Sequence, residues 1–507
     1  SNTWKKTNVN SGNWLVNFSQ KMREKLYSYL EDNGVEGKQL QVGSALLLGY
    51  RENLDKELIK SYSSAGAMHV LAVSGLHVGI LYLLLSNILN LFKKLKHSRY
   101  LIALILIASL WFYALMTGLS ASVLRSSTMF TFIIVGDKLL KRKVSIYNTL
   151  AVSAIVLLLI NPYMIYQVGF QLSYAAVLGI VYLQPKLYKL VFFNNSILQK
   201  IWAITCVSIA AQIATFPMSL YYFHQFPVYF FISNLVVIPS AILIFYLGIG
   251  LFVIAPFGGF ALVMGKVLNF FLWVLNQAIF ITEKLPYSLM EEMALSVFET
   301  YLLYLTIFLF LIALYYRKSR LVFATLFCLF IFVGIQLATQ YSSTQQHYLT
   351  FYSIKNETVF EMVTNKTVYF VSSKELKNDW SKMLFNVNNN WNNHNITKKI
   401  YMDVDSLSGL YEDESLFMQN GIFKFGNIVI QILNKNKKQW IKPDYLVVSK
   451  KSLPMLKSYL KEHNPKIVIF DSSLPSYKLK YYIENSVDTT TKFISLDKKY
   501  YSVDFTE

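Results

Sequence analysis

Charged residues and cysteines are both scarce in this chain. Asp, Glu, Lys and Arg make up 15% of its 507 residues, whereas about 25% is typical of a soluble protein. The two cysteines, Cys206 and Cys328, lie in apolar runs, so we expect neither a disulfide nor a zinc site built on thiolates. Because 54% of the residues are hydrophobic, the composition argues against a wholly soluble protein and predicts a membrane protein.

The apolar residues are concentrated in one part of the sequence. Long apolar runs extend from about residue 68 to residue 340, and the chain then turns polar. We therefore predict a polytopic α-helical membrane region at 68–340 and a soluble α/β or β-rich domain at 345–507. Residues 1–67 hold two amphipathic stretches, 13–34 and 39–66, which we expect to form interfacial or bundle-capping helices. Because the chain begins with Ser and shows no signal peptide, we expect it to be a truncated product.

About ten spans are predicted within the membrane region. A helix needs about 20 apolar residues to cross a bilayer, and several runs are shorter, so we expect some spans to be tilted, broken or re-entrant. The expected limits are 68–92, 100–116, 121–136, 148–160, 168–184, 200–216, 228–255, 260–282, 300–316 and 321–339.

Positive charge alternates between the loops that join these spans. It gathers in the loops at 93–99, 137–143, 186–200 and 317–320. The loops between them carry no Lys or Arg or are acidic on balance. Basic loops face the cytoplasm, so ten spans predict that both ends of the chain are extracytoplasmic. The net charge of +19 fits this rule and also fits a polyanionic ligand such as nucleic acid.

The predicted soluble domain alternates β-rich runs with helical stretches. We expect strands at 348–354, 367–373, 427–433, 445–449 and 466–473. A helix is expected at 452–464, and the Asn-rich tract 386–395 is predicted to be a loop.

Polar side chains open the first predicted span, in 68-MHVLAVSGLHVGILYLLL-85. His69 and His77 are eight residues apart with no carboxylate nearby in the sequence, so a metal site on this helix alone is not expected. Ser74 and His77 are spaced to touch on a helix, which suits a nucleophilic serine and its base in an intramembrane hydrolase. Alternatively, these groups line a polar path, or they hydrogen-bond between helices and hold a broken helix in place. Gly75 would let another backbone approach closely.

Further polar residues lie inside other predicted spans. Arg125 lies a turn inside the third span, Gln171 and Ser173 lie early in the fifth, and Asn234 lies in the seventh. A single intramembrane amide usually joins helices, and an arginine near a helix end can snorkel to the interface. Several such residues without a carboxylate inside the spans favour a polar cavity or an anion path over a proton-coupled pump.

These segments resemble the competence domain of the ComEC family, the inner-membrane channels of bacterial natural transformation. The pattern H-x-x-A-x-S-G-x-H at residues 69–77 is the hallmark, and the resemblance covers roughly residues 20–280. It continues through 44-SALLLGYRENLDKEL-58, 117-TGLSASVLRSS-127, 161-NP-162, 169-GFQLSYAAVLGI-180 and 234-NLVVIP-239. It implies that one strand of DNA passes across the inner membrane. It also implies that residues 1–67 follow an OB-fold, most or all of which is absent here.

Many members of this family end in a metallo-β-lactamase-like domain, from which residues 345–507 differ. The metal-binding pattern H-x-H-x-D-H does not occur, and Lys450 and Lys451 stand where the family has a pair of histidines. A dinuclear site needs His and Asp ligands at close quarters. We therefore predict a degenerate lactamase-like domain with no metal, no cofactor and no nuclease activity.

The resemblance thus implies a non-enzymatic channel for single-stranded DNA, embedded in membrane lipids. No Walker A motif occurs, so the implied partners include a cytoplasmic ATPase or helicase, a periplasmic DNA-binding receptor and a separate nuclease. An intramembrane serine hydrolase using Ser74 and a small-anion transporter are the alternatives. The residues expected to form the DNA path or its support are His69, Ser74, Gly75, His77, Arg125, Gln171, Ser173 and Asn234.

Overall fold

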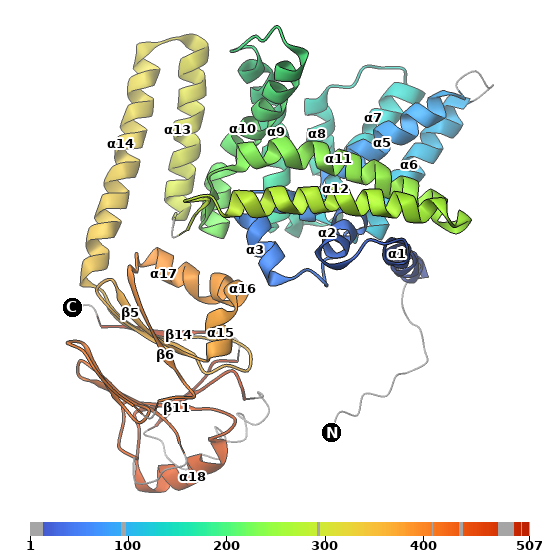
Figure 1. Ribbon diagram of the computed structural model, residues 1–507. Coiled ribbons are helices and arrows are strands. Elements are labelled where there is room, and N and C mark those ends of the chain that lie inside the picture. The colour runs from blue at the N-terminus through green and yellow to red at the C-terminus, as the bar shows by residue number, and fades with distance from the viewer. Residues whose placement is uncertain are drawn as a thin grey trace. The chain divides into compact units, whose positions relative to one another are not determined.

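The chain forms two compact units, residues 1–291 and 292–507 (Figure 1). The computed structural model describes residues 14–92, 98–291, 295–407, 409–434, 440–474, 491–497 and 499–505. Most of the basic loop predicted at 93–99 therefore lies outside the described residues.

The first unit is almost entirely helical, as its composition predicts. Its helices are α1 (Trp14–Asp32), α2 (Gly37–Leu48), α3 (Lys56–Ser64), α4 (Met68–Leu71), α5 (Gly75–Asn90), α6 (Ser98–Met116), α7 (Ala121–Ile134), the π-helical turn η1 (Val135–Leu139), α8 (Ile146–Ile160), the 3-10 turn η2 (Pro162–Tyr166), α9 (Val168–Tyr188), α10 (Ser196–Phe223), α11 (Phe230–Ile254) and α12 (Phe260–Glu283). Helices α11 and α12 run side by side (Figure 1) and share one apolar core with α2, α5 and α6.

Seven of the described helices are long and apolar enough to cross a membrane. They are α6, α9, α10, α11 and α12 of the first unit and α13 (Val297–Tyr316) and α14 (Ser319–Ser342) of the second. The prediction of a polytopic membrane protein is confirmed. The remaining predicted spans, 68–92, 121–136 and 148–160, fall on the shorter helices α5, α7 and α8.

Two continuous helical patterns in the sequence are broken in the structure. The predicted span 68–92 is one of the broken ones, because the backbone is extended at Ala72 and Ser74 between α4 and α5. The prediction of one amphipathic helix over 39–66 is wrong. There α2 ends at Gly49, whose φ of 71° lies in the left-handed region that glycine adopts without steric cost. Residues 42–48 of α2 are buried in the core of the unit.

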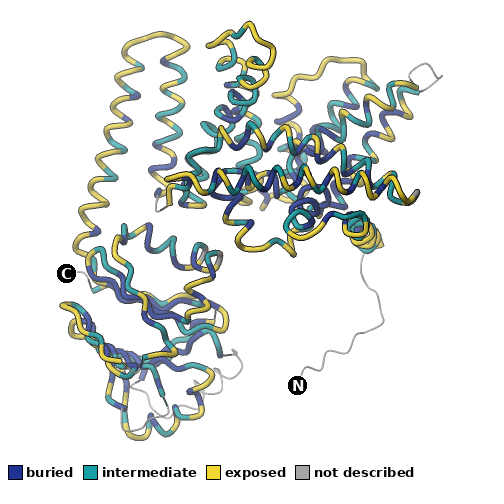
Figure 2. The backbone as a smooth tube through the Cα atoms, viewed as in Figure 1, coloured by how far each residue is buried: buried dark blue, intermediate teal, exposed yellow. Residues whose placement is uncertain are grey.

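The second unit begins with the hairpin of α13 and α14, whose surfaces are largely exposed and apolar (Figure 2). Such surfaces suit contact with lipid. Inside the hairpin the Glu299 carboxylate accepts hydrogen bonds from the Ser296 N–H at 2.7 Å and from Gln336 Nε2 at 2.7 Å. Both charge-assisted bonds satisfy a carboxylate that is 5% exposed.

Two sheets follow the hairpin and face one another. A five-stranded sheet has the order β14-β3-β4-β5-β6 and a seven-stranded sheet the order β13-β12-β11-β10-β9-β8-β7. The strands are β3 (His347–Phe351), β4 (Phe360–Thr364), β5 (Thr367–Ser372), β6 (Lys398–Asp403), β7 (Leu410–Glu412), β8 (Leu416–Gln419), β9 (Ile422–Phe425), β10 (Ile428–Ile432), β11 (Tyr445–Val448), β12 (Ile467–Phe470), β13 (Lys492–Ser495) and β14 (Tyr501–Asp504).

Alternating side chains of each strand build the layers of this domain. One face of each sheet enters a shared core, which includes Phe351, Phe360 and Tyr445. The opposite faces are covered by helices: α15 (Lys374–Asn378), α16 (Trp380–Met383) and α17 (Asn389–Asn393) on the five-stranded sheet, and α18 (Leu453–Glu462) on the other. The predicted α/β domain is confirmed, and the five expected strands occur as β3, β5, β10, β11 and β12.

The Asn-rich tract 386–395 is not the loop that its composition predicts. It forms part of a π-helical turn (Leu384–Asn388) and then helix α17. Val387 and Trp391 are buried there against the five-stranded sheet. Burial of these two apolar side chains therefore outweighs the weak helix propensity of asparagine.

Candidate functional site

Helix α5 begins at a capping box in which a histidine takes the place usually held by Glu or Gln. Ser74 is the N-cap, and its Oγ accepts a hydrogen bond from the Leu76 N–H at 3.3 Å. His77 Nδ1 accepts the Ser74 N–H at 3.1 Å and lies 3.2 Å from Ser74 Oγ. Because Nδ1 is an acceptor, neutral His77 carries its proton on Nε2.

His77 is fully buried. Its ring lies 5.6 Å from the ring of Phe245 in α11. Within the described parts of the chain, His77 Nε2 has no hydrogen-bond partner. Helix capping therefore accounts for the contact between Ser74 and His77. The two side chains are nevertheless close enough to act as a nucleophilic serine and its base.

Arg125 of α7 is held inside the helical unit and is only 5% exposed. Its Nε donates to Ser173 Oγ of α9 at 2.7 Å, and one terminal nitrogen donates to Ser126 Oγ at 3.1 Å. The other terminal nitrogen lies 3.5 Å from the Met129 sulfur. The guanidinium also lies 5.8 Å from the ring centre of Tyr174. Among the described residues no carboxylate pairs with it, so its charge is buried among neutral groups.

Hydroxyl groups extend this arrangement into a network that joins α7, α8 and α9. Ser122 Oγ lies 3.2 Å from Ser173 Oγ, and the Tyr174 hydroxyl lies 2.9 Å from Ser153 Oγ of α8. We call the set Gly75, Ser122, Arg125, Ser126, Ser153, Ser173 and Tyr174 the arginine cluster. Sequence reasoning selected only Gly75, Arg125 and Ser173 of this set. Ser122 lies one helical turn before Arg125, and this spacing could have identified it in the sequence as a neighbour of Arg125.

Gly75, the first residue of α5, brings this helix against the arginine cluster. A Cβ atom there would lie 2.6 Å from Ser126 Oγ and 2.7 Å from an Arg125 terminal nitrogen. Both distances are too short for any carbon contact. The N-terminus of α5, which carries partial positive charge, therefore lies directly beside a buried guanidinium.

Replacing Gly75 by alanine is expected to displace the Arg125 side chain and lower stability by about 1–3 kcal/mol, the usual cost of overpacking. Gly79, one turn further along α5, is the matched control, because a Cβ there would meet only Phe130 at 3.5 Å. The midpoint of thermal unfolding of the detergent-solubilised protein measures both variants. Equal midpoints for the two variants would contradict the tight packing at Gly75.

The remaining candidate residues lie outside the arginine cluster. Gln171 donates to the Ile165 carbonyl at 2.8 Å and accepts from the Tyr222 hydroxyl at 2.8 Å, which joins α9 to η2 and α10. Asn234 of α11 donates to Ser208 Oγ of α10 at 3.2 Å. Its buried Oδ1 has no partner in the described part of the chain. His69 is exposed and lies 3.2 Å from the Gly66 carbonyl.

The C-terminal domain gathers charged side chains where its parallel strands end. Lys451, which follows β11, lies 4.0 Å from Asp405, which follows β6. Lys374 lies 3.5 Å from Asp403, and the Lys450 N–H donates to Ser473 Oγ at 2.8 Å. Over the described ranges, no group of three or more His, Cys, Asp or Glu side chains is placed to hold a metal ion. An ammonium group beside a carboxylate forms an ion pair and supplies no metal ligand.

Comparisons with known proteins agree with this architecture. Residues 46–318, more than half of the chain, match the family described as "Competence protein", and residues 349–504 match the ComEC C-terminal domain. The chain is 33% identical over 199 residues to "ComE operon protein 3" of Bacillus subtilis (strain 168). It is also 33% identical over 141 residues to an uncharacterised protein of Aquifex aeolicus (strain VF5).

The matched stretches are 38% and 28% of this chain and cover 24% and 32% of these two relatives. The chain thus spans about a quarter and about a third of their lengths. No solved structure matches it. The two family matches together extend from helix α2 of the first unit to β14, the last strand of the C-terminal domain, and the chain therefore belongs to the ComEC family of competence proteins.

Proposed function

We propose that this protein passes a single strand of DNA across the cytoplasmic membrane during natural transformation. One observation carries the proposal: the Arg125 guanidinium is buried beside the N-terminus of α5, with no carboxylate partner among the residues that the structure describes. A guanidinium keeps its charge and forms paired hydrogen bonds to phosphate, and a helix N-terminus favours anions. A passing DNA phosphate would supply the negative charge that this site lacks.

The other candidate residues take two proposed roles along the same path. Gln171 and Asn234 support it, because their hydrogen bonds join α9, α10 and α11. Among the described residues, His77 Nε2 and Asn234 Oδ1 have no hydrogen-bond partner, and both are proposed to meet the strand. Ser74 caps the start of α5, and His69 lies in α4, before the break. In this proposal the basic loops 137–143 and 317–320 face the cytoplasm and both chain ends lie outside.

The C-terminal domain is proposed to lack nuclease activity of its own. Lys450 and Lys451 follow β11, and Lys451 lies beside Asp405 rather than beside a set of His and Asp ligands. Degradation of the other strand is therefore assigned to a separate nuclease. A periplasmic DNA receptor and a cytoplasmic ATPase or helicase complete the proposed set of partners. The ATPase or helicase is included because the sequence has no phosphate-binding P-loop.

Deleting the gene in its host tests the proposal directly. We expect labelled DNA to reach the periplasm but not the cytoplasm, and transformants to be lost, with recovery when the intact gene is restored. A His77→Ala variant in the same assay measures the contribution of the capping histidine. Normal transformation in the deletion strain would refute the proposed function.

The contact between Ser74 and His77 keeps an intramembrane serine hydrolase as the second candidate. Ser74→Ala separates the two functions. In a channel it removes one helix cap, which costs about 0.5–2 kcal/mol of stability, and transport is weakened rather than lost. In a hydrolase it abolishes activity. A small-anion transporter would instead show uptake of a small anion that competes with DNA at Arg125.

A further inference from the structure

A hollow of about 370 Å³, its open mouth included, lies between α1 and the segment that follows α2. Its lining residues are Arg23, Glu24, Tyr27, Tyr50 and Asn53. Without its open mouth the cavity volume is about 120 Å³, which is below the range of about 300–1,000 Å³ for drug-sized ligand sites. The hollow thus suits a single flat ring rather than a whole nucleotide.

The lining combines two aromatic rings with charged and amide groups. The rings of Tyr27 and Tyr50 lie 5.8 Å apart and are inclined by 64°. Both rings pack on the apolar core of the helical unit. The Arg23 guanidinium donates to the Met116 carbonyl at the end of α6. Its buried Nε has no hydrogen-bond partner within the described residues.

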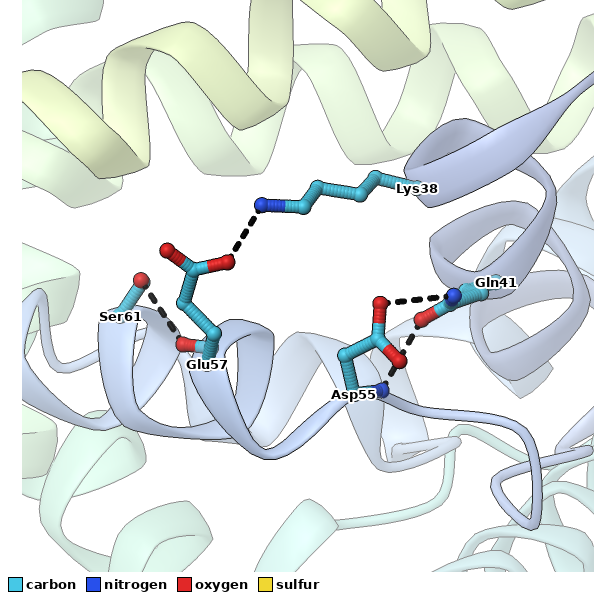
Figure 3. A network of polar contacts seen from close by, with 5 residues as sticks. All are labelled: Lys38, Gln41, Asp55, Glu57 and Ser61. Atoms are coloured by element: carbon cyan, nitrogen blue, oxygen red, sulfur yellow. Dashed lines mark hydrogen bonds and ion pairs between the residues drawn. The ribbon is translucent and has the colours of Figure 1, made fainter. Parts of the chain in front are cut away.

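The segment 49–55, which forms one wall, is fixed at both of its ends. At Gly49 a Cβ atom would lie 3.1 Å from the Thr117 carbonyl oxygen and 3.2 Å from a Val73 methyl group. At the other end the Asp55 N–H donates to Gln41 Oε1 and Gln41 Nε2 donates to Asp55 Oδ2, both at 2.9 Å (Figure 3). The wall is therefore formed before any ligand binds.

The same figure shows a second tie between α2 and α3, the ion pair of Lys38 and Glu57 at 2.6 Å (Figure 3). Because both groups are exposed, this pair adds little stability by itself. Together with the Gln41–Asp55 pair it fixes the direction in which segment 49–55 leaves α2 and enters α3.

The hollow adjoins the proposed DNA path. Gly49 contacts Val73, which directly precedes the capping residue Ser74. Arg23 holds the carbonyl of Met116, the residue before loop 117–120, which carries no Lys or Arg and is proposed to face outward.

We propose that the hollow binds an unpaired nucleobase of the incoming strand, an inference that rests on the proposed function. Bases stack on tyrosine rings largely independently of sequence. Arg23 adds a cation that can stack on a base, and Asn53 offers both a donor and an acceptor to a base edge. The Glu24 carboxylate repels phosphate and accepts hydrogen bonds from amino groups, so the lining favours a base over a phosphate or a lipid headgroup.

Oligonucleotide binding to the full chain in nanodiscs tests the inference. The probes are a fluorescent thymidine oligonucleotide and an abasic oligonucleotide of equal length, which has the same phosphates without bases. We expect the wild-type protein to bind the thymidine probe about tenfold more tightly. Tyr27→Ala and Tyr50→Leu should remove this preference while leaving affinity for the abasic probe unchanged. Leucine at position 50 keeps the apolar packing and removes the flat ring.

Tyr29→Ala is the matched control, because Tyr29 lies on the same helix and is not part of the lining. It should keep the preference for the thymidine probe. If both probes bind but Tyr27→Ala and Tyr50→Leu keep the preference, the base site is refuted and the proposed channel stands. If neither probe binds to the wild-type protein, both proposals fail. Loss of the preference only when short-chain phosphatidylglycerol is added would assign the hollow to a lipid headgroup and overturn the inference.

Discussion

Replacing Arg125 by alanine is expected to lower transformation about a hundredfold or more. The guanidinium is the cation that we propose to meet DNA phosphate, and a charge-assisted contact in a buried site contributes about 2–5 kcal/mol. A loss of about 3 kcal/mol corresponds to roughly a hundredfold weaker binding. The measurement is transformation frequency in a strain whose only copy of the gene carries the variant, with the amount of protein in the membrane determined by immunoblot.

Two further substitutions make this test specific. Arg125→Lys keeps the charge but loses the planar fork that donates to Ser126 and Ser173, so its defect should be smaller than that of alanine. Arg320→Ala removes an exposed arginine at the start of α14 and should transform normally. If the Arg125→Ala protein is present in normal amount and the strain transforms at the wild-type frequency, Arg125 does not bind DNA phosphate.

Stability separates the proposed role of Arg125 from a purely structural one. A charge buried without a carboxylate partner destabilises the folded state, so Arg125→Met should not lower the midpoint of thermal unfolding. An oligonucleotide should raise the midpoint of the wild-type protein, because a ligand that binds only the folded state stabilises it. The oligonucleotide should not raise the midpoint of the Arg125→Met variant. A lower midpoint for Arg125→Met would indicate that the side chain mainly supports the fold.

The membrane region and the strands of the C-terminal domain were predictable because they rest on local patterns. Long apolar runs predicted the helices, and β-branched and aromatic runs predicted strands such as β11 and β12. The break between α4 and α5 was not predictable in this way. It depends on the Ser74 cap and on the contact of Gly75 with Arg125, fifty positions further along the chain.

For the arginine cluster too, the sequence identified some of the residues, whereas their contacts depend on how distant helices pack. Arg125 and Ser173 were identified because polar groups stand out within apolar runs. Their partnership at 2.7 Å, and the part played by Tyr174 and Ser153, depend on how α7, α8 and α9 pack. Likewise, Arg23 and Tyr50 belong to separate amphipathic stretches in the sequence, and only the fold brings them to one hollow.

The second large effect is expected at Glu361, a fully buried carboxylate of β4. Its oxygens accept hydrogen bonds from the Tyr352 hydroxyl at 2.7 Å, from Asn390 Nδ2 at 2.7 Å and from Trp391 Nε1 at 2.6 Å. Asn390 and Trp391 belong to α17, so this carboxylate ties the helix that replaces the predicted loop to the sheet. Burial raises the pKa of Glu361 to about 7, and the three hydrogen bonds offset only part of that effect.

The raised pKa of Glu361 makes the stability of the C-terminal domain depend on pH. The folded state binds the proton more tightly than the unfolded chain, in which the pKa of a glutamate has its ordinary value of about 4.5. The stabilising contribution is therefore complete below about pH 4.5 and is lost as the pH rises to about 7. A shift of about 2.5 pKa units corresponds to roughly 3 kcal/mol. Burial also raises the pKa of the neighbouring Tyr352, which stays protonated across this range.

Glu361→Gln should abolish this pH dependence. The amide does not ionise, so the free energy of unfolding of the C-terminal domain should change by about 2.5 kcal/mol less between pH 5 and pH 8 than in the wild-type protein. Urea denaturation followed by brief proteolysis of the full chain measures it at both pH values. Glu375→Gln, an exposed residue of α15, should keep the wild-type pH dependence. An unchanged slope in Glu361→Gln would show that another group titrates, whereas a flat profile identifies Glu361 as the carboxylate that couples α17 to the sheet.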